Sequence, residues 1–346
     1  MNYGINNIIL ESPYSLIVSI IIFLGFLSTG EIIQKFFFKK IIKKKYNLEY
    51  NYFAPITGVY VVILPLYLIV IFSAGSKILF SSISYVLFIL GVIYFLKKTN
   101  KLENFSNKLN IKFIDPIIMI ILLYIGLFFI SASPITHADA LDYHAGSAIY
   151  ILNNGNFPNE ILPMHYLLSS FGELIIVLGF AAKTEQLGGI IQFASLFSLI
   201  PIFHTNSKKS LKPYILLLIL SFPVTLFLIS SPKPQILFVI STLIIFSFLI
   251  RYFEKLSLKD SKIAFIIIVT VLACNFLTKY SFILSSFLLY FYCLYLMLKR
   301  KLFLFSMLSS IIIFIILIAP QWFFRISNFG TFILREKKSN VNTIQR

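Results

Sequence analysis

Long apolar stretches recur along this chain, and their length limits what it can fold into. They run for about 17–22 residues between short polar segments, and a helix needs about 20 apolar residues to cross the hydrocarbon core of a bilayer. Apolar residues make up 58% of the 346 residues and charged residues only 12%, whereas a soluble domain carries about 25% charged residues. The sequence therefore predicts an all-α polytopic membrane protein.

The formal net charge of +17 raises the alternative of a nucleic-acid-binding protein, and the distribution of the basic residues argues against it. Lysines and arginines form short clusters between the apolar stretches, and the positive-inside rule places such clusters in cytoplasmic loops. We therefore expect the lipid bilayer, and no nucleic acid, as a partner. The clusters are Lys35–Lys45, Lys97–Lys112, Lys208–Lys212, Arg251–Lys262 and Lys299–Lys301.

Placing every basic cluster in the cytoplasm predicts about ten transmembrane helices and an N-terminus outside. Residues 1–113 are then N-terminal membrane helices with basic loops, residues 114–325 a membrane core with an acidic outer loop at 133–186, and residues 326–346 a polar tail. The predicted spans are 14–30, 53–74, 78–95, 114–131, 187–203, 214–230, 235–252, 263–277, 281–298 and 302–319.

One apolar segment, Tyr166–Ala182, is left out of this count. If it crossed the bilayer, the basic loop at Lys208–Lys212 would lie outside, against the charge rule. The segment also carries Ser170 and Glu173, which suit lipid poorly. We expect a re-entrant or interfacial helix that belongs to the outer loop.

Ionisable residues of another kind gather in the predicted outer loop. No lysine or arginine occurs between Lys112 and Lys183, and within that gap His137, Asp139, Asp142 and His144 fall inside eight residues. In a helix Asp139 and Asp142 share one face, with Tyr143 one turn from Asp139. Helix capping by Thr136 or Asp139 explains one carboxylate, but it does not explain both aspartates and both histidines. We therefore expect Asp139, with Asp142 second, to act as a general base.

Three cations fall on the same predicted face: Lys233, Lys279 and Arg325. They could hold a phosphate group, Arg325 through two parallel hydrogen bonds. The alternative for Lys233, which stands between two prolines, is a turn residue whose side chain reaches the membrane surface.

A metal site at Asp139 and His137 stays open, because carboxylate and imidazole groups are common ligands, although their spacing is not specific for a metal. Solvation at the membrane surface explains Glu160 and His165, and Glu173 suits either a substrate groove or water. His204 stands beside cytoplasmic lysines and has no predicted role. Cys274 and Cys293 lie in apolar segments and are expected as core residues.

The order of these segments resembles the GT-C superfamily of integral membrane glycosyltransferases. An apolar span leads into an outer loop with the acidic motif His137-Ala138-Asp139-Ala140-Leu141-Asp142-Tyr143-His144, and the segment Tyr166–Ala182 and further spans follow. The resemblance covers residues 114–325, with a specific motif of eight residues. It implies a helical bundle, a polyprenyl-phosphate sugar donor, and a base or metal ligand at Asp139. It departs from the superfamily in having three spans before the one that leads into the motif, and no soluble domain after the helices.

The sequence thus predicts transfer of a sugar from a polyprenyl-phosphate donor to a lipid or glycan acceptor at the outer face of the inner membrane. His137, Tyr143, His144, Lys233, Lys279 and Arg325 are the candidate substrate-binding or phosphate-binding residues. A polysaccharide polymerase or ligase, a lipid or solute transporter, and an inactive or truncated membrane protein are the alternatives.

Overall fold

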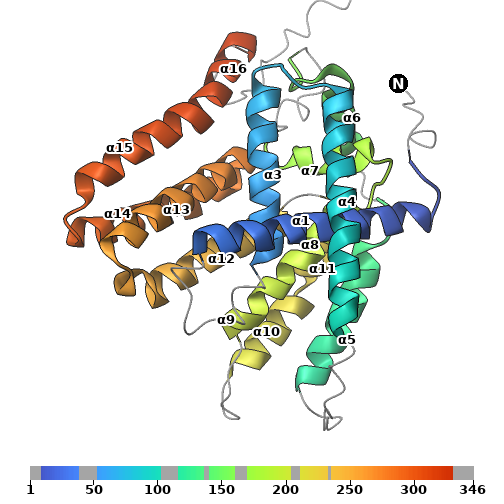
Figure 1. Ribbon diagram of the computed structural model, residues 1–346, viewed down its shortest axis with the longest axis horizontal. Helices are drawn as coiled ribbons and strands as arrows, with labels where there is room; N and C mark the ends of the chain where they lie inside the picture. Colours follow the sequence, from blue (N-terminus) through green and yellow to red (C-terminus); the bar gives the residue numbers. More distant parts are fainter. Residues whose placement is uncertain are drawn as a thin grey trace, which may run out of the picture.

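The computed structural model describes residues 9–38, 53–102, 116–135, 140–159, 170–203, 211–232 and 235–329, and every regular element in these ranges is a helix (Figure 1). The longer helices are α1 (Tyr14–Phe38), α3 (Ala54–Ile71), α4 (Lys77–Leu102), α5 (Pro116–Ser131), α12 (Gln235–Arg251), α13 (Leu258–Thr278), α14 (Ile283–Lys299), α15 (Phe303–Ile313) and α16 (Ala319–Phe329). Shorter helices are α6 (Gly146–Asn154), α7 (Glu173–Ala181), α8 (Leu187–Leu196), α9 (Ile200–Phe203), α10 (Lys212–Ser221) and α11 (Pro223–Ile229).

Five of these described helical stretches are long and apolar enough to cross a bilayer, which establishes a multi-pass helical membrane protein. The five are residues 14–36, 54–71, 77–99, 258–278 and 303–328, the last running through α15 and α16. The bent pair α10–α11 makes a sixth if it is one span. Four other apolar helices have 10–17 residues, so the predicted count of ten spans stays a prediction.

The predicted span at 214–230 is broken in the middle. Pro223 begins α11, and Phe222 before it takes an extended conformation with φ −66° and ψ 131°. A proline disfavours the helical conformation of the preceding residue, so α10 and α11 meet at a bend of 56°.

Helix α1 runs across α3 and α4 in Figure 1, and glycines allow the close approach. A Cβ added at Gly58 of α3 would overlap the carbonyl oxygen of Phe26 in α1, and one added at Gly91 of α4 would overlap that of Ile21. Small residues at helix interfaces let backbones approach closely in membranes. Glu31 adds a polar anchor, because it pairs with Lys98 at 3.1 Å and accepts a hydrogen bond from Tyr94 at 2.6 Å.

Helix α7 lies at the centre of the bundle (Figure 1), and all of its residues from Glu173 to Phe180 are buried. It contacts α3, α4, α6 and α8, and the Ser84 hydroxyl of α4 donates to the Leu178 carbonyl of α7 at 2.9 Å. Nine residues span about 14 Å at 1.5 Å per residue, which is too short to cross a bilayer. The length and burial show that α7 is not a complete span, and its re-entrant or interfacial position stays a prediction.

A buried polar layer joins α3, α12 and α13. The Tyr60 hydroxyl lies 2.9 Å from the Ser241 hydroxyl and donates to the Asn275 side-chain carbonyl, while the Asn275 amide donates to Ser241 and Thr242 at 3.1 Å each. Buried polar groups cost free energy unless they are paired, and here each partner comes from a different helix. The layer therefore fixes the register of the three helices.

The predicted domain boundary at residue 113 lies outside the described residues, and helices from its two sides pack together. Helix α1 contacts α8, and both α3 and α4 contact α7. At the other end of the chain, α16 continues to Phe329, so the helix extends four residues into the segment predicted as a polar tail.

We expect Gly58→Ala to lower the free energy of unfolding by about 1–3 kcal/mol, because the added methyl group forces α1 and α3 apart. Unfolding of the detergent-purified protein by denaturant measures this change. Gly126→Ala in α5 is the matched control, since an added Cβ there meets nothing within 4 Å, and it should be neutral or stabilising by about 0.5–1 kcal/mol. Equal effects of the two substitutions would contradict the glycine interface.

Candidate functional site

The centre of the candidate site is a buried pair formed by His144 and Glu173. His144 is the residue before the last in the π-helical turn Ala140–Ala145 that leads into α6, and Glu173 is the first residue of α7. The His144 Nδ1 lies 2.9 Å from the Glu173 Oε1, and the two residues are 7% and 5% exposed. In the neutral tautomer in which Nδ1–H donates to the carboxylate, Nε2 is the basic nitrogen. The pair therefore attaches the end of the acidic segment, residues 137–144, to α7.

The turn before α7 connects this pair to α13. The Ser170 backbone N–H donates to the Glu173 Oε2 at 2.9 Å, so both carboxylate oxygens are hydrogen-bonded. The Ser170 hydroxyl donates to the Leu277 carbonyl near the end of α13. Lys279 follows two residues later, and its side chain is exposed. The structure thus brings Lys279, a predicted phosphate-binding cation, to the same end of the bundle as the His144–Glu173 pair.

Aromatic rings connect the same region to the C-terminal helix. Tyr67 of α3 packs against Phe171 at a ring distance of 5.9 Å, and its hydroxyl donates to the Leu317 carbonyl at 2.9 Å. Arg325 of α16 is buried. Its neighbour Phe324 packs on Phe157, which also contacts Tyr67. Tyr67 therefore joins the C-terminal helix to the turn before Glu173.

A second acidic residue, Glu185, occupies the turn between α7 and α8. Burial raises the pKa of its carboxyl, and a hydrogen bond from the Ile135 backbone N–H partly opposes the shift. Thr184 beside it accepts from Ser15 of α1 at 3.1 Å and donates to the Ser15 carbonyl at 2.8 Å. This turn therefore anchors the start of α1 and is a structural contact rather than a part of the site.

Several predicted site residues fall outside the described parts of the chain: His137, Asp139 and Lys233, with Glu160, His165 and His204. The backbone of Asp142 and Tyr143 belongs to the π-helical turn Ala140–Ala145. Their side chains are not among the parts of the chain that the structure describes. The predicted metal ligands Asp139 and His137 are thus not placed. Among the described residues, no three His, Cys, Asp or Glu side chains gather as a metal site would require.

Sequence reasoning placed Glu173 in a substrate groove or in water, and the solvent-exposed interpretation is wrong because the side chain is buried and paired. It also missed Tyr67, which looked like one aromatic residue among many in an apolar span. Cys274 and Cys293 are buried, as expected for core residues. No pattern in the sequence joins His144 to Glu173, because 29 positions separate them.

The fold and this buried site define the chain as a multi-pass helical membrane protein with paired ionisable groups in its core. The chain belongs to the DUF1420 family, because the model of the DUF1420 N-terminal domain matches residues 1–116 and 94–336. No curated protein and no solved structure matches the chain.

We expect the His144–Glu173 pair to couple the acidic segment to α7 energetically. Glu173→Ala and His144→Ala should each cost about 1–3 kcal/mol of unfolding free energy, since each leaves a buried polar group without its partner. The double variant should cost less than the sum of the two by about 0.5–3 kcal/mol. Denaturant unfolding of the four proteins measures the coupling. Additive costs would show that the pair contributes no specific interaction.

Proposed function

We propose that this protein is a membrane glycosyltransferase that moves a sugar from a polyprenyl-phosphate donor to a lipid or glycan acceptor. The proposed site lies on the extracytoplasmic side of the inner membrane. The observation that carries the proposal is the anchoring of the acidic segment: the His144–Glu173 pair attaches it to α7, and the Ser170–Leu277 bond places α7 beside the end of α13, where Lys279 follows. We propose that the other acidic and basic groups of the predicted site, Asp139 and Lys233 among them, converge at this end of the bundle.

This convergence suits transfer from a phosphate leaving group. Asp139, or His144 through its Nε2, would take the proton from an acceptor hydroxyl as the new glycosidic bond forms. Lys279, Lys233 and Arg325 would stabilise the negative charge that develops on the phosphate as its bond to the sugar breaks. In this mechanism Glu173 is a positioning residue, because it holds the imidazole through Nδ1.

A transporter is the second candidate, and the bent helix pair α10–α11 is the observation that favours it. Broken helices are frequent at the substrate sites of secondary transporters. The buried Tyr60–Ser241–Asn275 layer would then line a substrate path. A transporter moves its substrate unchanged, so the chemical identity of the product separates the two candidates.

We expect the purified protein in lipid vesicles to transfer sugar from at least one of a panel of radiolabelled polyprenyl-phosphate sugars to added lipid or glycan acceptors. Asp139→Asn should lower the rate by about 10²–10⁴-fold, as expected for loss of a general base. Thin-layer separation of labelled products measures the transfer. Asp260→Asn is the matched control, since it changes a partly exposed aspartate that accepts from Ser257 at the start of α13.

The same assay distinguishes the alternatives. Retained activity in Asp139→Asn with loss in His144→Gln would assign the base to His144. Label that enters the vesicles with its donor intact, in the absence of any transfer product, would contradict the glycosyltransferase and support the transporter.

The proposed orientation predicts which helix ends face outward. In intact cells a membrane-impermeant maleimide should label Lys279→Cys, and Lys255→Cys should react only after lysis. Both positions are exposed, and the two native cysteines are buried, so the background should be low. The opposite labelling pattern would reverse the topology and place the site in the cytoplasm.

A further inference from the structure

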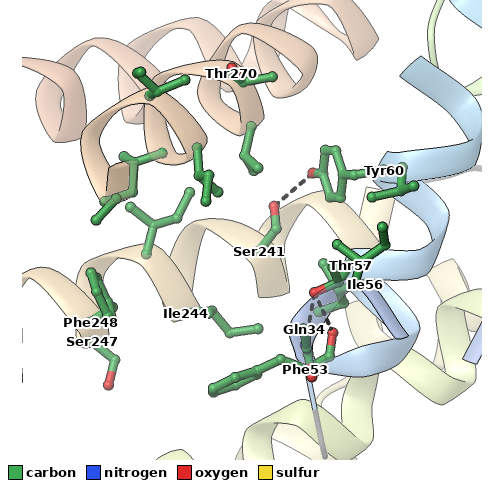
Figure 2. Close-up of a pocket in the computed structure, with 18 of the residues that line it drawn as sticks. Gln34, Phe53, Ile56, Thr57, Tyr60, Ser241, Ile244, Ser247, Phe248 and Thr270 are labelled. Carbon is green, nitrogen blue, oxygen red and sulfur yellow. Dashed lines mark hydrogen bonds between the residues drawn. The ribbon is translucent and has the colours of Figure 1, made fainter. Parts of the chain in front are cut away.

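A chamber of about 370 Å³ lies between the end of α1 and helices α3, α12 and α13 (Figure 2). Its walls are mainly aliphatic and aromatic, with Ile56, Ile244 and Phe248 among the lining residues. Pockets that bind small molecules commonly have volumes of about 300–1,000 Å³ and a lining of this kind. The chamber is therefore large enough for part of an apolar ligand.

The chamber is separate from the His144–Glu173 site. It uses the first part of α3 and of α13, from Phe53 to Leu64 and from Ala264 to Val271, whereas the candidate site adjoins Tyr67 and Leu277. Thr57 and Tyr67 are ten residues apart, or about 15 Å along the helix. Tyr60 and Ser241, which lie 2.9 Å apart between their hydroxyl oxygens, belong to the polar layer and line the chamber (Figure 2).

Among the described residues that line the chamber, Arg251 alone carries a formal charge. It is the last residue of α12 and is half-buried, and its Nη2 donates to the Ile202 carbonyl at 3.2 Å. A guanidinium has five N–H donors in a fixed fork that matches phosphate geometry. Arg251 can therefore hold this carbonyl and bind a phosphate at the same time.

Gln34 contributes a hydrogen-bond acceptor, in contrast to the donors of Arg251. Its amide nitrogen donates to the Thr57 hydroxyl at 2.9 Å, and the two residues lie together in Figure 2. Its Oε1 is buried without a hydrogen-bond partner among the described residues, although the side chain lines the chamber and is only 3% exposed. A buried acceptor costs free energy while it is unpaired. A ligand with a hydroxyl donor would satisfy it, and a bare hydrocarbon chain would not.

The sequence around Gln34 favours an anionic lipid. Residues 35–45 directly after the apolar part of α1 include six lysines, and such clusters beside a membrane helix attract acidic phospholipids. An amphipathic lipid also fits both parts of the chamber, with its chain between the apolar walls and its headgroup beside the two polar side chains.

We propose that this chamber binds an anionic phospholipid with a hydroxyl-bearing headgroup, of the phosphatidylglycerol type. The phosphate contacts Arg251, a headgroup hydroxyl donates to the Gln34 Oε1, and one acyl chain occupies the chamber. The site is independent of the proposed transferase activity, because it shares no residue with the His144–Glu173 site.

Native mass spectrometry of the detergent-purified protein tests the proposal with added phosphatidylglycerol, phosphatidic acid and phosphatidylcholine. Phosphatidylglycerol should bind best. Arg251→Gln should weaken its binding about tenfold, as loss of one charge-assisted hydrogen bond predicts. Lys255→Gln, which removes an exposed positive charge outside the chamber, should leave the binding unchanged. Gln34→Leu should remove the preference for phosphatidylglycerol over phosphatidic acid but keep the preference for both over phosphatidylcholine.

Two further experiments test the proposal if a polar variant folds poorly. Thr270→Phe adds bulk at a chamber-lining position on α13, a different helix from that of Arg251, and should reduce phosphatidylglycerol binding. Water-soluble glycerol phosphate shares the headgroup chemistry and should not displace the lipid. Equal binding of all three lipids, equal effects of Arg251→Gln and Lys255→Gln, or displacement by glycerol phosphate would each overturn the proposal.

Discussion

The need to pair a carboxyl group in the centre of a membrane bundle governs the architecture of this protein. Glu173 begins a helix that is buried on every side, and burial without partners would be costly. Its two oxygens accept from the Ser170 backbone and meet the His144 imidazole. Ser170 in turn donates to α13. The acidic segment, the central helix and the later helices are thus positioned by one connected set of polar contacts.

Around this centre, the packing of α1 against α3 and α4 depends on how closely the helix backbones can approach. Glycines at Gly58 and Gly91 let α1 lie against α3 and α4. A different glycine acts where the chain turns: Gly155 ends α6 with φ 75°, and its carbonyl accepts from the Gly75 backbone N–H at 3.1 Å. A left-handed residue without a side chain is required there, so the loop after α3 and the end of α6 can meet.

The two ends of the α3, α12 and α13 group have different chemistry. One end carries the ionisable groups for which we propose sugar transfer, and the other holds the apolar chamber with Arg251 and Gln34. The Tyr60–Ser241–Asn275 layer lies between them. Each end offers a cation beside apolar surface, so both ends suit lipids with a phosphate group. The proposal for one end can be tested without the proposal for the other.

The sequence by itself determined the class of the protein, because the length and composition of apolar stretches report directly on a bilayer. The break at Phe222-Pro223 follows from local proline geometry, although the sequence analysis predicted one unbroken span at 214–230. The burial of α7 was decided by tertiary structure alone, since an apolar segment with one glutamate has the same sequence pattern in the core and at the membrane surface. The His144–Glu173 pair and the roles of Tyr67 and Gln34 likewise depend on helices far apart in the chain. Local sequence does not specify which distant groups will form hydrogen bonds with a buried side chain, because those partners come together only when the helices pack.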